Sequence, residues 1–190
     1  MAAFYQHLIS ALWLIWALYW WALSRRVKAT VRVESRLSRA LHFGPLLLAA
    51  WPLWVPALPR LGLDRQLLPW SPWQFWVGAA LTAAGLLFAV WARRHIGRNW
   101  SGSVTLKQGH ELITSGPYAL VRHPIYTGLL LAFAGSALVR GEWRGVLAVA
   151  LVLAALWRKL RLEEQWMREQ FGAVYEAYSA RVVALIPGLL

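Results

Sequence analysis

The sequence predicts an all-α membrane protein with about five transmembrane helices and a further helix on the cytosolic side. Three observations support this fold class. The chain has 190 residues, of which 59% are hydrophobic, and its mean hydropathy is +0.45. A soluble domain of this size rarely has so much apolar surface, because its interior is too small to bury it. Five apolar stretches also approach the length of about 20 residues that spans a bilayer, namely residues 4–23, 41–58, 73–91, 125–139 and 146–160.

The five stretches differ in what they predict. Residues 4–23 are followed rather than preceded by positive charges and end at no small-residue cleavage site, so we expect a retained span and not a signal peptide. Residues 125–139 are short for a full span, and we expect them to be tilted or to form a tight hairpin with residues 146–160. The second stretch is expected to be bent or broken, because proline removes a backbone donor. Its prolines are Pro45, Pro52, Pro56 and Pro59.

The distribution of charge favours a membrane protein over a nucleic-acid-binding protein. The net charge is +12, but the basic residues flank the apolar stretches and form no separate basic domain. If the odd-numbered stretches run inward, only four of the 20 Lys and Arg side chains lie on the outer side: Arg60, Arg65, Arg140 and Arg144. Cytosolic loops are enriched in such residues, so we expect a multi-pass protein with its N-terminus outside and its C-terminus in the cytosol. The preference for arginine over lysine suggests a bacterial inner membrane.

Residues 116–128, with the sequence GPYALVRHPIYTG, bring unusual residues together between two apolar segments. Pro124 suits the first position of a helix, and the residue before a proline avoids helical torsion angles. We therefore expect His123 to be an N-cap and the helix start to face the cytosolic mouth. The free N–H groups and the positive end of the helix dipole attract a carboxylate or phosphate there, and Arg122 adds a fixed cation.

Two further residues extend this site along the same helix. Tyr126 lies three residues after His123 and shares its face. Gly128 exposes bare backbone, which lets a ligand or another helix come close. Each residue alone suits an ordinary capped helix start, but the combination of these residues with the preceding Gly-Pro-Tyr indicates a binding site.

The pair Glu163–Glu164 follows the last apolar stretch. Neighbouring side chains on a helix point about 100° apart, so the two carboxylates cannot face one pocket equally. We expect one to bind a ligand and the other to pair with a basic residue, because a carboxylate at this depth needs a partner. The basic residues that suit this role are Arg161, Arg168 and Arg122. Residues 163–179 have apolar side chains at helical spacing, with Gly172 as a point of interruption, and predict a cytosolic or interfacial helix.

Metal and thiol chemistry are not expected. The chain has no cysteine, so it has no disulfide, no thiolate nucleophile and no cysteine-based metal site. His95, His110 and His123 are far apart in the sequence and form no H-E-x-x-H pattern. The sequence also lacks a G-x-S-x-G nucleophile elbow, a phosphate-binding loop and a dinucleotide-binding pattern.

The sequence RHPIYTG at residues 122–128, followed by EEQWMREQFGAVYEAYSARV at residues 163–182 and a closing Ile-Pro, resembles a known group. This group comprises the isoprenylcysteine carboxyl methyltransferases and phospholipid methyltransferases, which share R-H-P-x-Y-x-G and then E-E. The likeness covers residues 98–187. It implies an integral-membrane enzyme without a Rossmann domain that uses S-adenosylmethionine. It also implies a cofactor pocket that faces the cytosol, between the last two helices and the C-terminal segment.

The resemblance also assigns roles to residues that match the pattern. His123, Tyr126 and Gly128 would line the cofactor, and one of Glu163 and Glu164 would hold its ammonium or ribose hydroxyls. The residues implied in catalysis are Arg122, which would orient cofactor or substrate, and the two glutamates. The segment from His110 to Tyr118 matches a stretch that closes over the cofactor, and Tyr178 and Arg181 match a tail that folds back toward the site.

The expected activity is therefore methyl transfer at the cytosolic face to a hydrophobic or membrane-embedded acceptor: a carboxylate, a thiol or a lipid amine. We expect one integral-membrane domain over residues 1–190. Residues 1–92 would form a three-helix scaffold, and residues 93–190 the cofactor-binding loop, a helix hairpin and the tail. Apart from the acceptor and membrane lipid, the sequence indicates no nucleic acid and no obligate protein partner.

The alternative is an NADPH-dependent membrane reductase of the sterol-reductase type, which has a similar R-H-P-x-Y element. Those enzymes usually have asparagine after the proline and an acidic residue after the glycine. Ile125 and Leu129 occupy these positions here, and they favour the methyltransferase. A membrane scaffold without enzymatic activity is the third interpretation, and it predicts that neither nucleotide cofactor binds.

Overall fold

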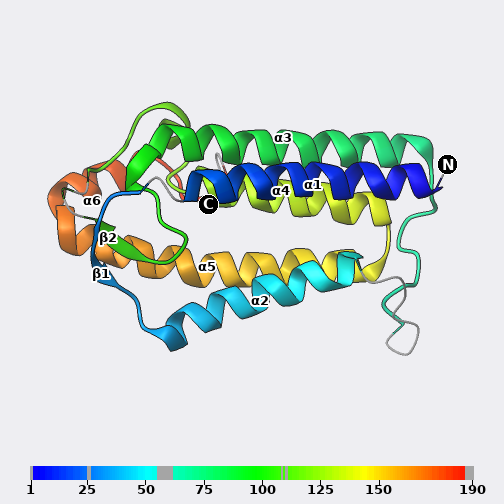
Figure 1. The fold of residues 1–190 in the computed structure, drawn as a ribbon, viewed down its shortest axis with the longest axis horizontal. Coiled ribbons are helices and arrows are strands. Elements are labelled where there is room, and N and C mark those ends of the chain that lie inside the picture. The colour runs from blue at the N-terminus through cyan, green and yellow to red at the C-terminus, as the bar shows by residue number, and fades with distance from the viewer. Residues whose placement is uncertain (1, 25–26, 55–61, 108, 110, 187–190) are drawn as a thin grey trace.

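The computed structural model describes residues 2–24, 27–54, 62–107, 109 and 111–186. It is a bundle of long helices that lie along one axis (Figure 1), and it is mostly helical, as predicted. The helices are α1 (Ala2–Ser24), α2 (Arg36–Trp54), α3 (Pro72–Ile96), α4 (Pro124–Arg140), α5 (Trp143–Phe171) and α6 (Ala173–Ser179). Two short 3-10 helices, η2 (Gly97–Asn99) and η3 (Gly116–Ala119), and two strands, β1 (Thr30–Val33) and β2 (Thr105–Lys107), complete the description.

Within the described residues, two helices are long and apolar enough to cross a membrane, as judged by length and composition. The segments that meet these criteria are His7–Ser24 and Pro72–Asn99, and Pro124–Arg140 is a shorter apolar helix. Large apolar side chains of α1 lie on the outside of the bundle, among them Leu14 and Ile15 at 60% and 66% exposure. Such an apolar exterior suits contact with lipid. The number of five spans and their orientation remain predictions.

The second apolar stretch is less interrupted than its prolines suggest. Helix α2 continues through Pro45 and Pro52 to Trp54, so it is not broken at either proline. Pro56 and Pro59 lie outside the described residues. Each proline removes one donor from the helix ladder, and α2 nevertheless packs along α5 as one helix.

A small antiparallel sheet was not predicted from the sequence. Strands β1 and β2 pair Thr30 with Lys107 and Val33 with Thr105, and both strands lie outside the five apolar stretches. The backbone of Glu34 continues the pairing by donating to the Val104 carbonyl at 3.1 Å. The sheet therefore ties the α1–α2 connection to the polar segment that follows α3.

Helices α3 and α4 pack most closely, through pairs of glycines. A Cβ atom on Gly78 would lie 2.6 Å from the Gly135 carbonyl oxygen, and one on Gly128 would lie 2.5 Å from the Gly85 carbonyl oxygen. Real Cβ atoms essentially never approach so closely. Small residues allow two helix backbones to touch, so the glycines of α3 and α4 account for this close packing.

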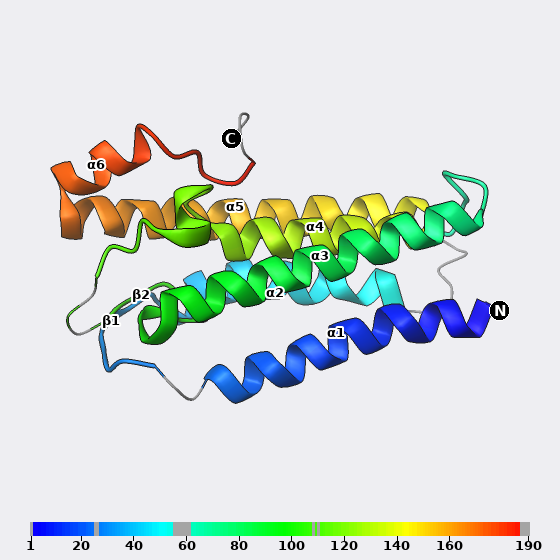
Figure 2. The same cartoon turned by 90° about the horizontal axis from the view of Figure 1, so that it is seen from above.

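Alternating helix directions gather the polar loops at one end of the bundle. The C-terminal ends of α1, α3 and α5 lie together with the N-terminal ends of α2 and α4, and with β1, β2, η3 and α6 (Figures 1 and 2). Gly172, at φ 50° and ψ −127°, separates α5 from α6 as expected, and α6 folds back over the end of α5 (Figure 2). The residues of the predicted site come from this end.

The glycine contacts make a testable prediction about stability. Gly78→Ala should lower the free energy of unfolding by about 1–3 kcal/mol, because the new methyl group overpacks the α3–α4 contact. Gly44→Ala in α2 is the matched control, since a Cβ there meets no atom within 4 Å. The measurement is thermal unfolding in detergent. Equal midpoints for the two variants would contradict the packing argument.

Candidate active site

A cavity of about 500 Å³ lies at the polar end of the bundle. Ligand pockets in proteins typically measure roughly 300–1,000 Å³, so the cavity is large enough for a cofactor or substrate. Its wall has a polar part and an apolar part. The polar part includes Asn99, Arg122, His123, Tyr126, Lys159 and Glu163. The apolar part includes Trp16, Trp20, Phe43, Leu46, Leu129 and Leu156.

The start of α4 has the geometry that the sequence predicted. His123 has non-helical torsion angles, φ −123° and ψ 62°, and Pro124 is the first residue of the helix. The His123 carbonyl accepts hydrogen bonds from the backbone N–H groups of Tyr126 and Thr127, each at 3.0 Å. The His123 side chain makes no capping bond to the helix, and its ring lines the cavity instead.

The C-terminal tail packs against this helix start. The backbone N–H groups of Arg122 and His123 donate to the carbonyls of Val183 and Ala184, at 2.9 and 3.0 Å. The Thr127 hydroxyl donates to the Leu185 carbonyl at 2.6 Å. The tail therefore binds the backbone just before α4 and fixes the position of the motif.

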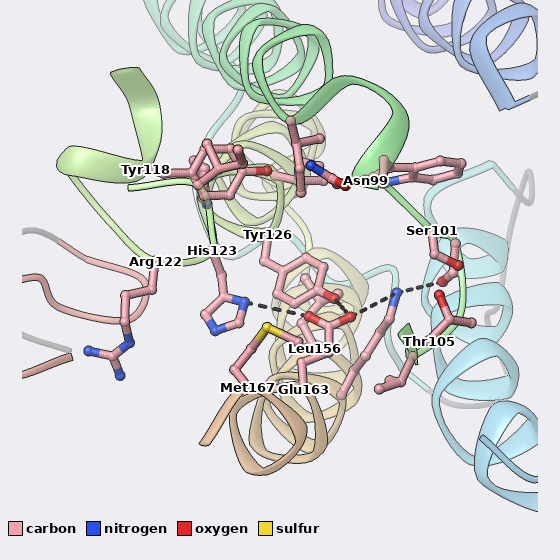
Figure 3. A pocket seen from close by; sticks show the side chains of 18 of the residues that line it. Asn99, Ser101, Thr105, Tyr118, Arg122, His123, Tyr126, Leu156, Glu163 and Met167 are labelled. Carbon is pink, nitrogen blue, oxygen red and sulfur yellow. Dashed lines mark hydrogen bonds and ion pairs between the residues drawn. The ribbon is translucent and has the colours of Figure 1, made fainter. Parts of the chain in front are cut away.

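Tyr126, His123 and Glu163 form a connected cluster on the cavity wall (Figure 3). The Tyr126 hydroxyl donates to Oε1 of Glu163 at 2.6 Å. The His123 and Tyr126 rings are stacked, with centroids 5.3 Å apart and planes inclined by 7°. Nδ1 of His123 lies 3.6 Å from Oε2 of Glu163. The structure thus brings three of the predicted residues together from α4 and α5.

Glu164 has a different environment. Of the described residues, Glu163 lines the cavity whereas Glu164 does not. Nε and Nη2 of Arg122 contact Oε1 of Glu164 at 2.7 and 2.6 Å, and Nη2 of Arg168 lies 3.4 Å from Oε2. Nη1 of Arg122 donates to the Ser179 carbonyl at 3.1 Å and also to the Val182 carbonyl. The Arg122–Glu164 pair therefore joins α4, α5 and the tail.

The two carboxylates and His123, which lie outside the predicted spans, influence one another's protonation. Burial favours the neutral acid, but hydrogen bonds from His123 and Arg122 outweigh it and lower the pKa of Glu164 from 4.5 to about 2. Burial also opposes ionisation of Glu163, yet the Lys159 charge and the His123 and Tyr126 contacts lower its pKa. Burial disfavours a charged His123 ring, but the two carboxylates outweigh it and raise its pKa.

The remaining predicted residues are more dispersed. Tyr118 lines the cavity, and its carbonyl accepts a 2.6 Å hydrogen bond from the Tyr178 hydroxyl. Gly128 faces α3, where a Cβ would meet the Gly85 carbonyl, and is not among the described cavity-lining residues. Arg181 is exposed and donates to the Ala177 carbonyl. His110 lies outside the described residues.

The structure also adds residues that the sequence analysis did not place at the site. Lys159 lines the cavity one helical turn before Glu163, and this i, i+4 spacing was a usable signal. Other lining residues come from distant segments, with no motif to indicate them: Trp16, Phe43, Asn99, Trp100 and Thr105. Among the described residues, three of these carry a buried polar atom without a hydrogen-bond partner, namely Trp16 Nε1, Asn99 Oδ1 and Thr105 Oγ1.

Fold and site together define a helical protein whose cavity is lined by many apolar and several polar side chains, and whose C-terminal tail holds the start of α4 beside it. Comparison with known families is consistent with this class. The model of the phospholipid methyltransferase family matches residues 73–174, more than half of the chain. The chain therefore belongs to the phospholipid methyltransferase family.

Individual relatives match over shorter lengths. A protein-S-isoprenylcysteine O-methyltransferase of Schizosaccharomyces pombe is 34% identical over 94 residues, 48% of this chain and 40% of the relative. Methanethiol S-methyltransferase 2 of Bradyrhizobium diazoefficiens is 40% identical over 83 residues, 43% of this chain and 30% of the relative. A cobalt-zinc-cadmium resistance protein of Cupriavidus metallidurans is 30% identical over 116 residues, 60% of this chain and 52% of the relative. The chain thus spans about half or less of these three relatives.

The opposite pKa shifts predict a window of maximal stability. Glu164 has a lowered pKa, so its contribution is present above pH 4.5 and is lost as the pH falls toward 2. His123 has a raised pKa, so its contribution is present below pH 6.5 and is lost as the pH rises through the folded-state value. Both contributions to stability are therefore fully present between pH 4.5 and pH 6.5. Thermal unfolding from pH 3 to pH 9 should show the highest midpoint there.

Two variants test whether Glu164 and His123 cause this pH dependence of stability. The stability difference between wild type and Glu164→Gln should shrink by roughly 2–3 kcal/mol as the pH falls from 5 to below 2.5, since one pKa unit corresponds to about 1.4 kcal/mol. The stability difference between wild type and His123→Asn should shrink as the pH rises above 6.5. A difference that does not change with pH in either variant would contradict the corresponding assignment.

Proposed function

We propose that this chain transfers the methyl group of S-adenosylmethionine to a hydrophobic or membrane-embedded acceptor. The observation that carries the proposal is the cluster of Tyr126, His123 and Glu163, which lies on the wall of a cavity that continues into an apolar part. A polar, charged cofactor suits the first region and an apolar acceptor suits the second. Membership of the phospholipid methyltransferase family supports this assignment.

The residues present fit this cofactor. S-adenosylmethionine carries an ammonium group, a carboxylate, ribose hydroxyls and a sulfonium. Glu163 offers a carboxylate on the cavity wall for the ammonium or the hydroxyls. Aromatic faces attract a sulfonium as they attract other cations, and several aromatic side chains line the cavity, among them Tyr118, Tyr175 and Trp100. The buried Asn99 Oδ1, which has no hydrogen-bond partner among the described residues, adds a polar group at the same cavity.

When bound, S-adenosylmethionine supplies a methyl group on a sulfonium sulfur, which is already a good electrophile. The chain then has to align the two partners and exclude water. Tyr126 fixes the carboxylate of Glu163 through its 2.6 Å hydrogen bond, and the stacked His123 ring restricts both groups. In this proposal Glu163 contacts the cofactor, whereas Arg122 and Glu164 are positioning residues that hold the motif and the tail together.

The alternative of an NADPH-dependent reductase receives less support. The family match and the two relatives that are named as methyltransferases favour methyl transfer. The printed names of the relatives refer to an isoprenylcysteine, to methanethiol and to metal resistance, so likeness alone leaves the acceptor open. The two cofactors differ enough for a binding measurement to separate the two functions.

Cofactor binding is the direct test. The purified chain should bind S-adenosylmethionine and S-adenosylhomocysteine in isothermal titration calorimetry, and it should not bind NADPH. Glu163→Gln should weaken this binding by roughly 10- to 150-fold, because a hydrogen bond to a charged group contributes about 1.5–3 kcal/mol. Tyr126→Phe should weaken it less, because it removes only the bond that fixes Glu163.

Glu169→Gln is the matched control for this measurement. Glu169 lies on the same helix, but its carboxylate is paired with Arg32 at 2.7 Å and is 44% exposed. This variant should bind the cofactor like the wild type. Binding of NADPH in place of S-adenosylmethionine would reject the proposed function, and unchanged affinity in Glu163→Gln would reject the site assignment.

We also propose a multi-pass arrangement in a bacterial inner membrane, with the N-terminus outside and the C-terminus in the cytosol. The gathering of the polar loops at one end of the bundle supports it (Figures 1 and 2). Because the chain has no cysteine, a single introduced cysteine shows on which side of the membrane its position lies. In intact cells, a membrane-impermeant maleimide should label Gln66→Cys and not Gln170→Cys, although both positions are exposed. The reverse pattern would invert the proposed orientation.

A further inference from the structure

The cavity-lining face of α5 has a definite order along the helix. Leu156, Lys159, Glu163 and Met167 line the cavity, and their spacing of three and four residues places them on one face. Since a helix rises 1.5 Å per residue, the backbone of Lys159 lies about 6 Å along the helix axis from that of Glu163, on the side of the apolar Leu156. The Lys159 ammonium has Oε1 of Glu163 3.8 Å away and the centre of the Phe43 ring 5.9 Å away, so polar and apolar lining residues meet at this group.

Lys159 is a buried cation, with 7% of its surface exposed. Its Nζ donates to the Gly102 carbonyl at 2.6 Å and lies 3.8 Å from Oε1 of Glu163. It also lies 5.3 Å from the centre of the Tyr126 ring and 5.9 Å from that of Phe43. A buried charge is stable only with compensating partners. Among the described residues, the nearest carboxylate oxygen to the Lys159 ammonium is that of Glu163, and at 3.8 Å it lies beyond hydrogen-bond distance.

That carboxylate is shared. Glu163 accepts the Tyr126 hydrogen bond and faces His123 as well as Lys159. The contacts of His123 with both glutamates favour its protonated form, and Glu164 is engaged by Arg122 and Arg168. One carboxylate thus lies between two cations on the cavity wall. The buried carboxylate of Glu34 is engaged by the Val104 N–H group and the Ser38 hydroxyl, so the two cations on the wall share the Glu163 carboxylate and favour an anionic group in the adjacent part of the cavity.

The cavity is poorly suited to deprotonate an acceptor. Glu163 is already held by Tyr126 and the neighbouring cations, which lower its pKa and make it a weak base. Glu111, which also lines the cavity, is paired with Lys28 at 3.3 Å and is 69% exposed. An amine acceptor must lose a proton during methylation, whereas an acceptor that is already an anion needs no base.

We propose that Lys159 is the specificity-determining residue for the methyl acceptor, and that it selects an anionic nucleophile, a thiolate or a carboxylate, on an apolar body. The apolar body occupies the part of the cavity lined by Phe43, Leu46 and Leu156. This inference rests on the proposed methyl transfer and names the acceptor class for the same cavity. A thiol beside the Lys159 ammonium also ionises more readily than in water.

The reaction balances without a proton transfer. An electron pair of the thiolate sulfur or carboxylate oxygen forms the new bond to the methyl carbon. The bond from that carbon to the sulfonium sulfur breaks, and its electron pair returns to sulfur. The anion and the sulfonium become a neutral thioether or ester and neutral S-adenosylhomocysteine, and Lys159 keeps its charge throughout.

The test uses acceptors of one chain length and the full chain in detergent, loaded with S-adenosylhomocysteine. Calorimetry gives the Kd of decanoate and decylamine, with empty micelles as the blank. Methyl transfer from labelled S-adenosylmethionine compares decanoate, 1-decanethiol and decylamine. Wild type should bind decanoate at least ten-fold more tightly than decylamine and should methylate the thiol or carboxylate in preference to the amine.

Substitutions of Lys159 separate its charge from its structural hydrogen bond. Lys159→Gln keeps a donor for the Gly102 carbonyl but removes the charge, so the preference for decanoate should fall below three-fold while the Kd of S-adenosylhomocysteine changes less than three-fold. Lys159→Arg should retain the preference. A purely structural role of Lys159 would alter folding or cofactor affinity and leave the preference between acceptors unchanged.

Binding of S-adenosylhomocysteine distinguishes a failure of this inference from a failure of the proposed function. Equal or tighter binding of decylamine, no binding of decanoate, or a wild-type preference in Lys159→Gln would overturn this inference alone, provided that S-adenosylhomocysteine binds. If S-adenosylhomocysteine does not bind to the wild-type chain, the proposed function and the inference fail together.

Discussion

The buried ion pair between Arg122 and Glu164 is the interaction on which the rest of the site depends. The guanidinium contacts the carboxylate through two nitrogens and uses the third for two carbonyls of the tail. Loss of one partner of a buried pair leaves an uncompensated charge and typically costs about 3–5 kcal/mol. The start of α4, the end of α5 and the tail are therefore mutually dependent. Arg122 belongs to a motif that resembles a ligand-binding sequence, yet its side chain has a structural role.

The adjacent glutamates show how helix geometry divides two identical side chains between two tasks. Because neighbours on a helix point about 100° apart, only Glu163 reaches the cavity, and Glu164 is left facing Arg122. His123 contacts both carboxylates, at 3.6 and 3.4 Å, and so couples the structural pair to the cavity wall. A disturbance of the tail that moved Arg122 would reach Glu163 through this ring.

The sequence predicted much of the bundle, because apolar segment length and turn chemistry are local properties. The start of α4 followed from Pro124 and the break after α5 from Gly172, and both positions were confirmed. The pairing of β1 with β2 was missed, since it joins segments more than 70 residues apart. The same limit applies to the site. Tyr126 and Glu163 were accessible through motifs, whereas Trp16 and Asn99 reach the cavity only through tertiary packing.

The close contact between α3 and α4 explains why the cavity forms beside α5. Glycines on the α3–α4 face let the two helix backbones approach each other closely, which leaves little room between these helices. The larger side chains of α1, α2 and α5, among them Trp16, Phe43 and Leu156, instead surround the cavity. In the proposed methyl transfer, a water-soluble cofactor would approach from the polar loops and an apolar acceptor through the helices. This arrangement would let one small helical bundle bind one ligand from water and another from the lipid.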